Sequence, residues 1–343
     1  MLIRTLDYYE DFHCLAGACP HTCCTGWEVV IDEETAARYQ GLSGTLGEKL
    51  RRNLSWDADG DFCFALEGGR CPFLDQEGLC EIHRTLGEDW TSETCQQHPR
   101  FTEDYGAFQE VTLSSSCPAA NALLLGSGTP LHILTREAPG EAEEGDPWLP
   151  FLLPLRERML ALLWEEDRSL HRRLLDVLLL GRDAQDLLDR ERAEDLPEFA
   201  AAWTAPALEC SSQGPGLFPG ALRFLGTLES LESDWGALLA AAETAVPESR
   251  RQGRLERIGA YFLFRYLLKC VNNGDLLGRV ELCVLSVLVV ERIGAVCGLA
   301  EALRRFSGEI EHSRENLEAL QAAFRWEEAL SLDRLLRTLS REE

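Results

Sequence analysis

Thiol side chains are the densest source of chemistry in this sequence. Nine of its thirteen cysteines fall within the first 117 residues. Eight of the nine lie beside turn residues or in short polar runs, where several thiolates can be aimed at a shared point: Cys14, Cys19, Cys23, Cys24, Cys71, Cys80, Cys95 and Cys117. Thiolates are soft ligands that select iron–sulfur clusters or zinc. The pattern therefore predicts a bound metal centre rather than disulfides.

The spacing of these cysteines excludes the simplest metal motifs. Zinc ribbons carry paired C-x2-C knuckles and bacterial ferredoxins a C-x2-C-x2-C run, and neither occurs here. Radical-SAM enzymes carry C-x3-C-x2-C; Cys19 and Cys23 match the first gap, but Gly26 occupies the third position. What remains is C-x4-C-x3-CC followed by single cysteines. Neighbouring side chains usually diverge, so we do not expect Cys23 and Cys24 to bind the same ion. Which four cysteines ligate, and whether a second centre exists, stays open.

The other five cysteines have weaker patterns. For Cys63, ligation and simple burial both remain open. We expect Cys210, Cys270, Cys283 and Cys297 to be packed as small apolar side chains, because the last three lie on apolar helical segments.

Composition limits the partners and the compartment. The formal net charge of -25 argues against nucleic acid, because a phosphate backbone must be met by lysine and arginine. It permits a basic partner or a cationic group, and it could equally serve only solubility. The longest apolar run, residues 282–290, is too short to span a bilayer, which needs about 20 residues, so no membrane insertion is expected. The amino terminus reaches acidic residues before any signal-like segment, which predicts a cytoplasmic protein.

The elements that must position the thiols are short. Asp32 has the character of a helix N-cap, and residues 62–66 and 108–113 have strand-like composition. A region with so few long apolar periods gains little from packing, so metal ligation would add to its stability. The domain prediction is a cysteine-rich metal-binding domain at 1–136, an acidic linker at 137–147 and a helical domain at 148–343.

Helical periodicity dominates after residue 148. The fold class expected is mainly α: a cysteine-rich amino-terminal region with short strands, followed by an all-helical carboxy-terminal region. The helical segments expected are 149–180 with a break at Pro154, 183–195, 221–242, 248–269, 276–303, 308–323 and 326–339. A single helix over 308–323 would place Glu311 and Glu315 on one face, and His312 and Asn316 on another. Gly126 ends an apolar helix rather than opening a nucleotide-binding loop, so a doubly wound fold is not expected.

Several blocks of the sequence resemble the flagellin lysine N-methylase family. They are the run from Cys14 to Trp27, residues 71–80, Leu86-Gly87, the 94–100 segment, Ser116-Cys117-Pro118, and two later blocks at 261–266 and 309–317. The cysteine blocks are also shared with a wider group of zinc- or iron-chelating proteins, so the two later blocks make the resemblance specific. Cys63 has no counterpart in the family pattern.

The resemblance implies a bacterial cytoplasmic enzyme that transfers methyl groups from S-adenosylmethionine to lysine side chains of flagellin. It also implies a [4Fe-4S] cluster held by the amino-terminal cysteines, with zinc as the alternative metal. Two other classes stay open: an iron–sulfur protein of redox or electron transfer, and a zinc-stabilised binding module without catalysis. About 200 residues of helix would be unexplained by electron transfer alone.

Methyl transfer to lysine requires a neutral amine and a site that excludes water. Carboxylates, tyrosines and histidine are the groups that can remove the proton, which gives the catalytic candidates Tyr261, Glu311 and His312. Arg265, one helical turn after Tyr261, can pair with the methionyl carboxylate of the cofactor, and its alternative is an interhelical ion pair. Aromatic faces stabilise a sulfonium, so Tyr266 is a cofactor-binding candidate. Arg100 is also assigned to cofactor binding, near the metal cluster.

Overall fold

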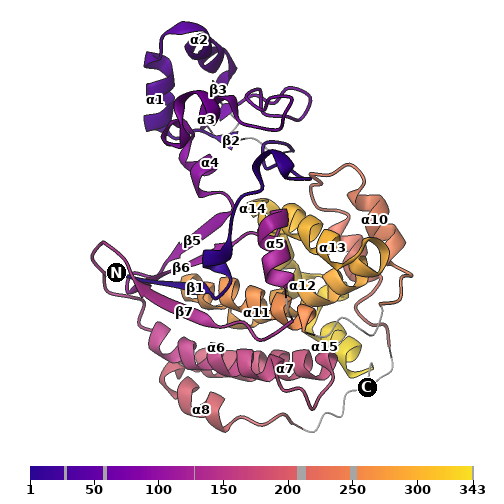
Figure 1. Cartoon of the computed structure of the whole chain (residues 1–343). Coiled ribbons are helices and arrows are strands. Elements are labelled where there is room, and N and C mark those ends of the chain that lie inside the picture. Colours follow the sequence, from indigo (N-terminus) through magenta and orange to yellow (C-terminus); the bar gives the residue numbers. More distant parts are fainter. Residues whose placement is uncertain (27–28, 57–59, 127, 207–213, 248–252, 342–343) are drawn as a thin grey trace. The chain divides into compact units, whose positions relative to one another are not determined.

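The chain divides into two compact units. The structure is a computed structural model, and it describes residues 1–26, 29–56, 60–126, 128–206, 214–247 and 253–341. The cysteine unit comprises Asp11–Phe101 and Leu113–Ala120, and the helical unit comprises Met1–Glu10, Thr102–Thr112 and Asn121–Glu343 (Figure 1). The boundaries differ from those expected at 136 and 148, because the first strand and the 102–112 segment belong to the helical unit.

The cysteine unit is built from short elements around a small apolar core. Its helices are α1 (Glu33–Gly41), α2 (Gly44–Asn53), α3 (Glu81–Leu86) and α4 (Glu93–Gln97). Its three-stranded sheet has the order β2 (Val29–Val30), β4 (Phe62–Phe64) and β3 (Leu54–Trp56). The core gathers Ile31, Tyr39, Leu50, Phe64, Phe73 and Ile82. Strands and turns in the amino-terminal region were expected, and this part of the fold class is confirmed.

Side-chain hydrogen bonds cap these short helices and connect them to one another. Asp32 caps α1 as predicted, because its Oδ1 accepts from Thr35 N at 2.8 Å. The other oxygen, Oδ2, accepts from Glu93 N at 2.9 Å, at the start of α4. Tyr39 OH donates to Trp90 O at 2.6 Å. One aspartate and one buried tyrosine thus connect α1 to the segment that carries Cys95.

A four-stranded sheet forms one part of the helical unit. Its order is β5 (Arg100–Asp104), β6 (Phe108–Leu113), β1 (Leu2–Leu6) and β7 (Ile133–Glu137). β1 runs parallel to β6 and antiparallel to β7. Alternate residues of a strand face the same side, and on β6 this places Glu110 beside Arg156 of α6 and Thr112 beside Arg265 of α11. In Figure 1 the strands fan out beside these two helices.

The rest of the helical unit is α-helical, which confirms the second part of the predicted fold class. Its helices are α6 (Leu149–Leu163), α7 (Leu170–Leu188), α8 (Leu196–Ala202), α9 (Gly220–Leu225), α10 (Trp235–Ala242), α11 (Arg254–Tyr266), α12 (Leu276–Cys297), α13 (Leu299–Phe306), α14 (Arg314–Trp326) and α15 (Leu332–Ser340). The helix α5 (Pro118–Leu125) precedes them. α12 is buried along most of its length and packs against α7, α11 and α13. A helix that is apolar on nearly all sides belongs in the centre of a domain.

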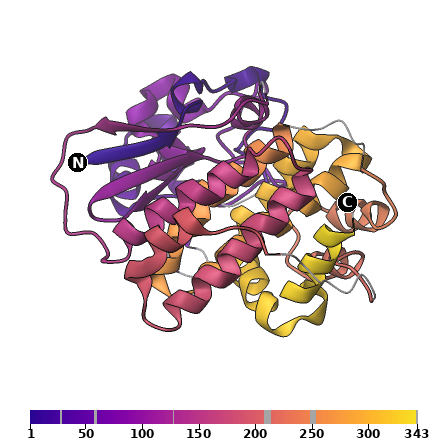
Figure 2. The ribbon, with the colours of Figure 1, turned by 90° about the horizontal axis from the view of Figure 1, so that it is seen from below.

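Two expected boundaries were wrong around α6 and α7, which run side by side (Figure 2). Pro154 does not end α6, which continues to Leu163. The next helix, α7, begins after its N-cap Ser169. α7 also passes through Gly181. A Cβ there would come within 2.9 Å of Val280, so the glycine allows α7 and α12 to approach closely.

Three other segments depart from the expected pattern. The 221–242 segment forms two helices, α9 and α10, and the helix expected to reach residue 269 changes to a 3-10 helix at Leu267. The acidic 137–147 segment connects β7 to α6 within the helical unit. Within the described ranges, no helix is long and apolar enough to cross a membrane.

The helix expected over 308–323 is also interrupted. A π-helical turn occupies Ser307–Glu311, and α14 begins only at Arg314, with Ser313 as its cap. Glu311 is buried and Glu315 is exposed, so the shared face predicted for this pair was wrong. Such a turn carries one more residue than an α-helical turn, so residues on its two sides lose the α-helical relationship.

Candidate functional sites: the thiol-rich unit and a buried tyrosine–arginine–glutamate cluster

All eight predicted metal ligands lie in the cysteine unit. Every cysteine among the described residues is a free thiol. The Cys14–Cys19 turn contacts the loop between Cys71 and Cys80, because a Cβ on Gly17 would lie only 2.8 Å from Glu77 O. The Cys14–Cys19 turn and the loop between Cys71 and Cys80 therefore lie against each other.

Three of the thiols lie at the apolar core. Cys24, Cys71 and Cys80 pack against this core. Cys71 N donates to Cys24 O at 2.8 Å, and Cys80 forms a β-bridge with Leu74. Main-chain contacts thus join Cys24 to the loop at Cys71 and close that loop at Cys80.

Helix starts supply N–H groups to several sulfurs. Burial raises the pKa of the Cys80 thiol, and the N–H groups of Ile82 and His83 at the start of α3 oppose this rise. Burial likewise raises the pKa of Cys117, opposed by two N–H groups at the start of α5. Ala16 N donates to Cys14 Sγ at 3.3 Å. N–H donors favour the thiolate over the thiol, and thiolates are the form that binds metal.

The adjacent thiols of Cys23 and Cys24 were expected to point away from each other, but they interact. They form a hydrogen bond with each other, which lowers the pKa of Cys24 to about 6 and raises that of Cys23. Arg70 also lowers the pKa of Cys24. The hydrogen bond from Cys23 and the charge of Arg70 therefore favour Cys24 as the thiolate of the pair.

The cysteine thiols are of the right chemical type to bind a metal as thiolates. Their side chains are not arranged as a complete set of ligands. In the described part of the chain, no three His, Cys, Asp or Glu side chains converge closely enough to hold a metal ion. The thiols nevertheless affect one another electrostatically: Cys24 acts on Cys71, Cys80 and Cys95, whereas Cys14 and Cys19 act on Cys117. Binding would require the thiol side chains to turn toward one another.

The remaining cysteines are placed as packed side chains where the structure describes them. Cys63 is buried in β4, with its Sγ 3.5 Å from Ser55 Oγ. Cys270 and Cys283 are buried in the helical unit and Cys297 is half-buried. Cys210 lies outside the described residues.

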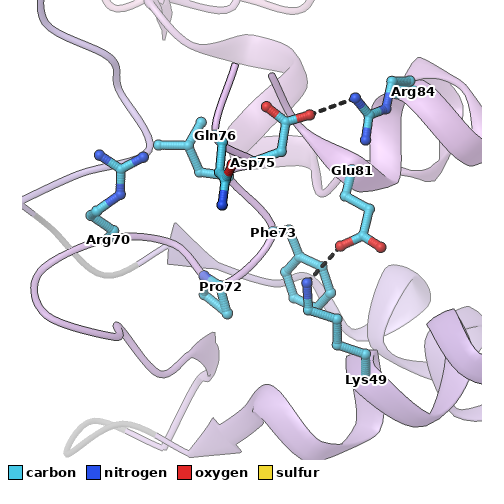
Figure 3. Close-up of a pocket in the computed structure, with 9 residues that line it drawn as sticks. Lys49, Arg70, Pro72, Phe73, Asp75, Gln76, Glu81 and Arg84 are labelled. Carbon is cyan, nitrogen blue, oxygen red and sulfur yellow. Dashed lines mark hydrogen bonds and ion pairs between the residues drawn. The ribbon is translucent and has the colours of Figure 1, made fainter. Parts of the chain in front are cut away.

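A surface depression in the cysteine unit was not anticipated from the sequence. It has a volume of about 570 Å³ and is lined by Lys49, Arg70, Pro72, Phe73, Leu74, Asp75, Gln76, Glu81 and Arg84 (Figure 3). Two ion pairs occupy its wall, Lys49–Glu81 at 2.5 Å and Arg84–Asp75 at 2.6 Å. Its cations are largely matched by carboxylates, and none of the predicted site residues lines it.

The helical unit contains a buried cluster of four of the predicted site residues. This Tyr–Arg–Glu cluster consists of Tyr261, Arg265 and Tyr266 from α11 and Glu311 from the π-helical turn. The two phenols donate to Glu311 Oε1, at 3.1 Å from Tyr261 and 2.9 Å from Tyr266. Arg265 Nε lies 2.8 Å from the same oxygen. All four side chains are at most 8% exposed, so their interactions are only weakly screened by water.

Arg265 has the alternative role foreseen for it, an ion pair between helical segments. Besides Glu311 it contacts the sheet, because its Nη1 donates to Thr112 Oγ1 at 2.9 Å. Burial raises the pKa of both tyrosines, and the nearby Glu311 carboxylate adds to the rise. The phenols are therefore neutral donors at physiological pH. Thr112 was not found from the sequence, since nothing local relates it to residue 265.

His312 lies directly after this cluster and is partly buried. Burial lowers its pKa to about 4, and the positive charge of Arg265 contributes. An imidazole with this pKa is uncharged at neutral pH but is a weak base. Arg100 belongs to the cysteine unit, where its guanidinium lies 5.4 Å from the centre of the Phe12 ring.

Comparison with known proteins places the amino-terminal region in a recognised group. A protein-family profile described as "Putative zinc- or iron-chelating domain" matches residues 13–118. Over 127 residues the chain is 29% identical to the lysine N-methylases of Salmonella choleraesuis and Salmonella typhimurium, a match covering 34% of this chain and 31% of each relative. Thus the match spans about a third of the length of those two relatives.

A third relative is covered more fully. The chain is 31% identical over 127 residues to the flagellar biosynthetic protein FliU of Salmonella muenchen, and the match covers 34% of this chain and 73% of that protein. No solved structure shows a significant match.

Proposed function

The chain belongs to the flagellin lysine N-methylase family, and on this premise we propose that it transfers methyl groups from S-adenosylmethionine to lysine side chains of flagellin. The observation that carries the proposal is the buried carboxylate of Glu311, surrounded by two phenols and a guanidinium. Both reactants are cationic before reaction, a sulfonium and an ammonium. A buried carboxylate beside aromatic rings is suited to attract such groups.

Removal of the lysine proton is the step that most needs a protein group. Glu311 is the proposed base, because a carboxylate held by two phenol donors can accept the proton of the lysine ammonium. The neutral amine then attacks the methyl carbon, so that the C–N bond forms as the S–C bond breaks and its electron pair stays on sulfur. Tyr261 and Tyr266 would hold the carboxylate in place, and the weak basicity of His312 makes it a secondary candidate.

Cofactor binding is proposed for the same region, with Tyr266 presenting an aromatic face to the sulfonium. Arg265 already contacts Glu311 and Thr112, so pairing with the methionyl carboxylate would require these contacts to separate. For Arg100 we propose a role in holding a cofactor within the cysteine unit.

The metal is proposed as a [4Fe-4S] cluster, with zinc as the alternative, held by four of the eight thiols named above. When bound it would supply folding free energy to a unit with a small core. Cys24, Cys71, Cys80 and Cys95 would hold it, because the first three pack at the same apolar core and each of the last three is influenced by the charge of Cys24. N–H donors near Cys80 would stabilise the bound thiolate.

The decisive experiment is incubation of anaerobically purified protein with S-adenosylmethionine and the flagellin of the same organism. Mass spectrometry of flagellin peptides should show added methyl groups on lysine, and none when the cofactor is omitted. Absence of methylation by metal-replete protein would overturn the proposal. A reversible redox signal without methylation would favour the electron-transfer class, and stoichiometric zinc without methylation would favour a binding module.

A further inference from the structure

The π-helical turn that carries Glu311 has its own supports, which the proposed chemistry does not use. Ser307, Glu309, Ile310 and Glu311 are all buried in this turn. π-helical geometry is rare and occurs mostly as single turns, frequently at functional sites. The turn contacts α13 and α14, and its Glu309 accepts hydrogen bonds from the segment that leads into α10. The supporting contacts therefore bear on where Glu311 lies.

Glu309 holds one side of the turn. Its side chain is 1% exposed, and its two oxygens each accept a main-chain N–H at 2.8 Å, from Leu231 and from Glu232. Glu309 thus faces the 229–232 segment, while Glu311 two residues later faces the Tyr–Arg–Glu cluster. One short turn connects these two sets of contacts.

Asn316 holds the other side of the turn. Its Nδ2 donates to Glu309 O and to Glu229 O, both at 2.8 Å, and its Oδ1 accepts from Glu229 N at 3.1 Å. These bonds use both amide hydrogens and the amide oxygen of a buried side chain. Asn316 therefore joins the end of the π-helical turn, the start of α14 and the 229–232 segment.

Ion pairs also connect Glu232 and Asp234 to α13. Arg304 of α13 contacts Glu232 at 2.8 Å, and Arg305 contacts Asp234 at 2.7 Å. The Asp234 side chain is 62% exposed, so this outer pair is worth little. The outer pairs hold the segment to α13, whereas Glu309 and Asn316 contact the turn itself.

We infer that Glu309 and Asn316 are positioning residues, which fix Glu311 within the Tyr–Arg–Glu cluster by holding the π-helical turn against residues 229–232. The inference rests on the proposed function for its catalytic consequence. An α-helical turn advances by about 100° per residue, so loss of the extra residue from the turn would rotate Glu311 away from Tyr261 and Arg265. A displacement of about 1 Å at a reacting group can lower a rate about 100-fold.

The test compares Glu309→Gln with Asp234→Asn. Both replace a carboxylate by its amide, but Glu309 lies in the π-helical turn and accepts from residues 231 and 232, whereas Asp234 pairs with Arg305 of α13. Only the first variant removes an acceptor from the π-helical turn. With Glu309→Gln, kcat for flagellin methylation should fall by about 10- to 100-fold while KM for flagellin changes by less than about 3-fold. Asp234→Asn should leave both constants within about twofold of the parent. Asn316→Ala should reproduce the fall in kcat.

A double-substitution cycle separates positioning from general loss of stability. If Glu309 acts through Glu311, adding Glu309→Gln to Glu311→Gln should lower kcat by less than about twofold more. Unchanged kcat in folded Glu309→Gln protein, or losses that multiply in the double variant, would overturn the inference.

The same cycle can be measured by denaturant unfolding, without methylation. Coupling between residues 309 and 311 should change the unfolding equilibrium constant by about threefold or more, and additive effects would overturn the inference. If the parent protein does not methylate flagellin, the proposed function fails, and this unfolding cycle still decides whether Glu309 fixes Glu311.

Discussion

The two units of the molecule hold their polar groups in different ways. In the cysteine unit, main-chain hydrogen bonds and short capped helices surround a small apolar core that the thiols border. In the helical unit, a long buried helix supports fully buried ion pairs, including Arg156–Glu110 at 2.5 Å and Arg173–Glu256 at 2.6 Å. The first unit therefore has much to gain from a bound metal, whereas the second is stabilised by packing and paired charge.

The comparison also assigns the chemistry. The residues proposed for proton removal are gathered in the helical unit, and the residues proposed for metal binding are gathered in the cysteine unit. Substitutions in one unit should therefore leave the property of the other largely intact. Substitutions in each unit test this separation.

Cys71→Ser should remove the metal and unfold the cysteine unit, because Cys71 borders the core beside Cys24 and Cys80. Metal content by elemental analysis should fall from about stoichiometric to near zero, and near-ultraviolet circular dichroism should show partial unfolding. Cys63→Ala is the matched control, since Cys63 is buried against Ser55, and it should keep the metal. Equal metal content in the two variants would remove Cys71 from the ligand set.

Glu311→Gln should lower kcat for flagellin methylation by about 100-fold or more, because the amide cannot accept the lysine proton. The metal content should stay at the parent value. Glu315→Gln is the control, because Glu315 is exposed on α14. A parent-like rate in Glu311→Gln, measured on folded protein, would exclude Glu311 as the base.

Arg156→Met should destabilise the helical unit by about 3–5 kcal/mol, because it leaves the buried carboxylate of Glu110 without its bidentate partner. Denaturant unfolding measures the effect. Arg158→Met breaks a partly exposed pair with Glu165 and should cost about 1 kcal/mol or less. Comparable losses for the two variants would show that burial of the pair does not matter.

Glu281→Gln should stabilise the helical unit at alkaline pH. Burial raises the pKa of Glu281 to about 8, and Asp275 adds to the rise. The folded state therefore keeps a proton that the unfolded chain releases near pH 4.5, so stability is lost as pH rises from about 4.5 to 8. The substitution should leave stability at pH 4.5 nearly unchanged and raise it by up to about 4 kcal/mol at pH 8.

Urea unfolding at pH 4.5 and pH 8 tests this prediction. Glu318→Gln, at an exposed position of α14, provides the control and should show no such pH dependence. A variant whose advantage over the parent did not grow with pH would contradict a raised pKa at residue 281.

Local signals in the sequence predicted a large part of the fold. The N-cap at Asp32, the strands at β4 and β6 and most helical segments could be identified, because capping and hydrophobic periodicity depend on neighbours in sequence. The pairing of Tyr261 with Arg265 on one helical face was also foreseeable from their spacing. Pro154 and Gly181 misled the boundaries, because tertiary packing tolerates a proline early in α6 and uses a glycine where α7 meets α12.

The candidate site was only half predictable. Residue types in the two late blocks pointed to Tyr261, Arg265, Tyr266 and Glu311, and the structure brings all four together. Thr112, Glu309 and the true surroundings of His312 could not be predicted. The partners of Glu309 and Thr112 lie 77 to 153 residues away in the chain, and no local pattern encodes such pairings.

By itself, the sequence determined the inventory of thiols, the exclusion of the simplest metal motifs and the helical character of the later residues. These follow from residue type and from spacing within one or two turns. Only the tertiary structure decided that Glu311 is buried and Glu315 is exposed. That choice depends on the π-helical turn, which is stabilised by main-chain N–H groups of residues 231 and 232. A helix period alone cannot reveal a turn whose supports come from a distant segment.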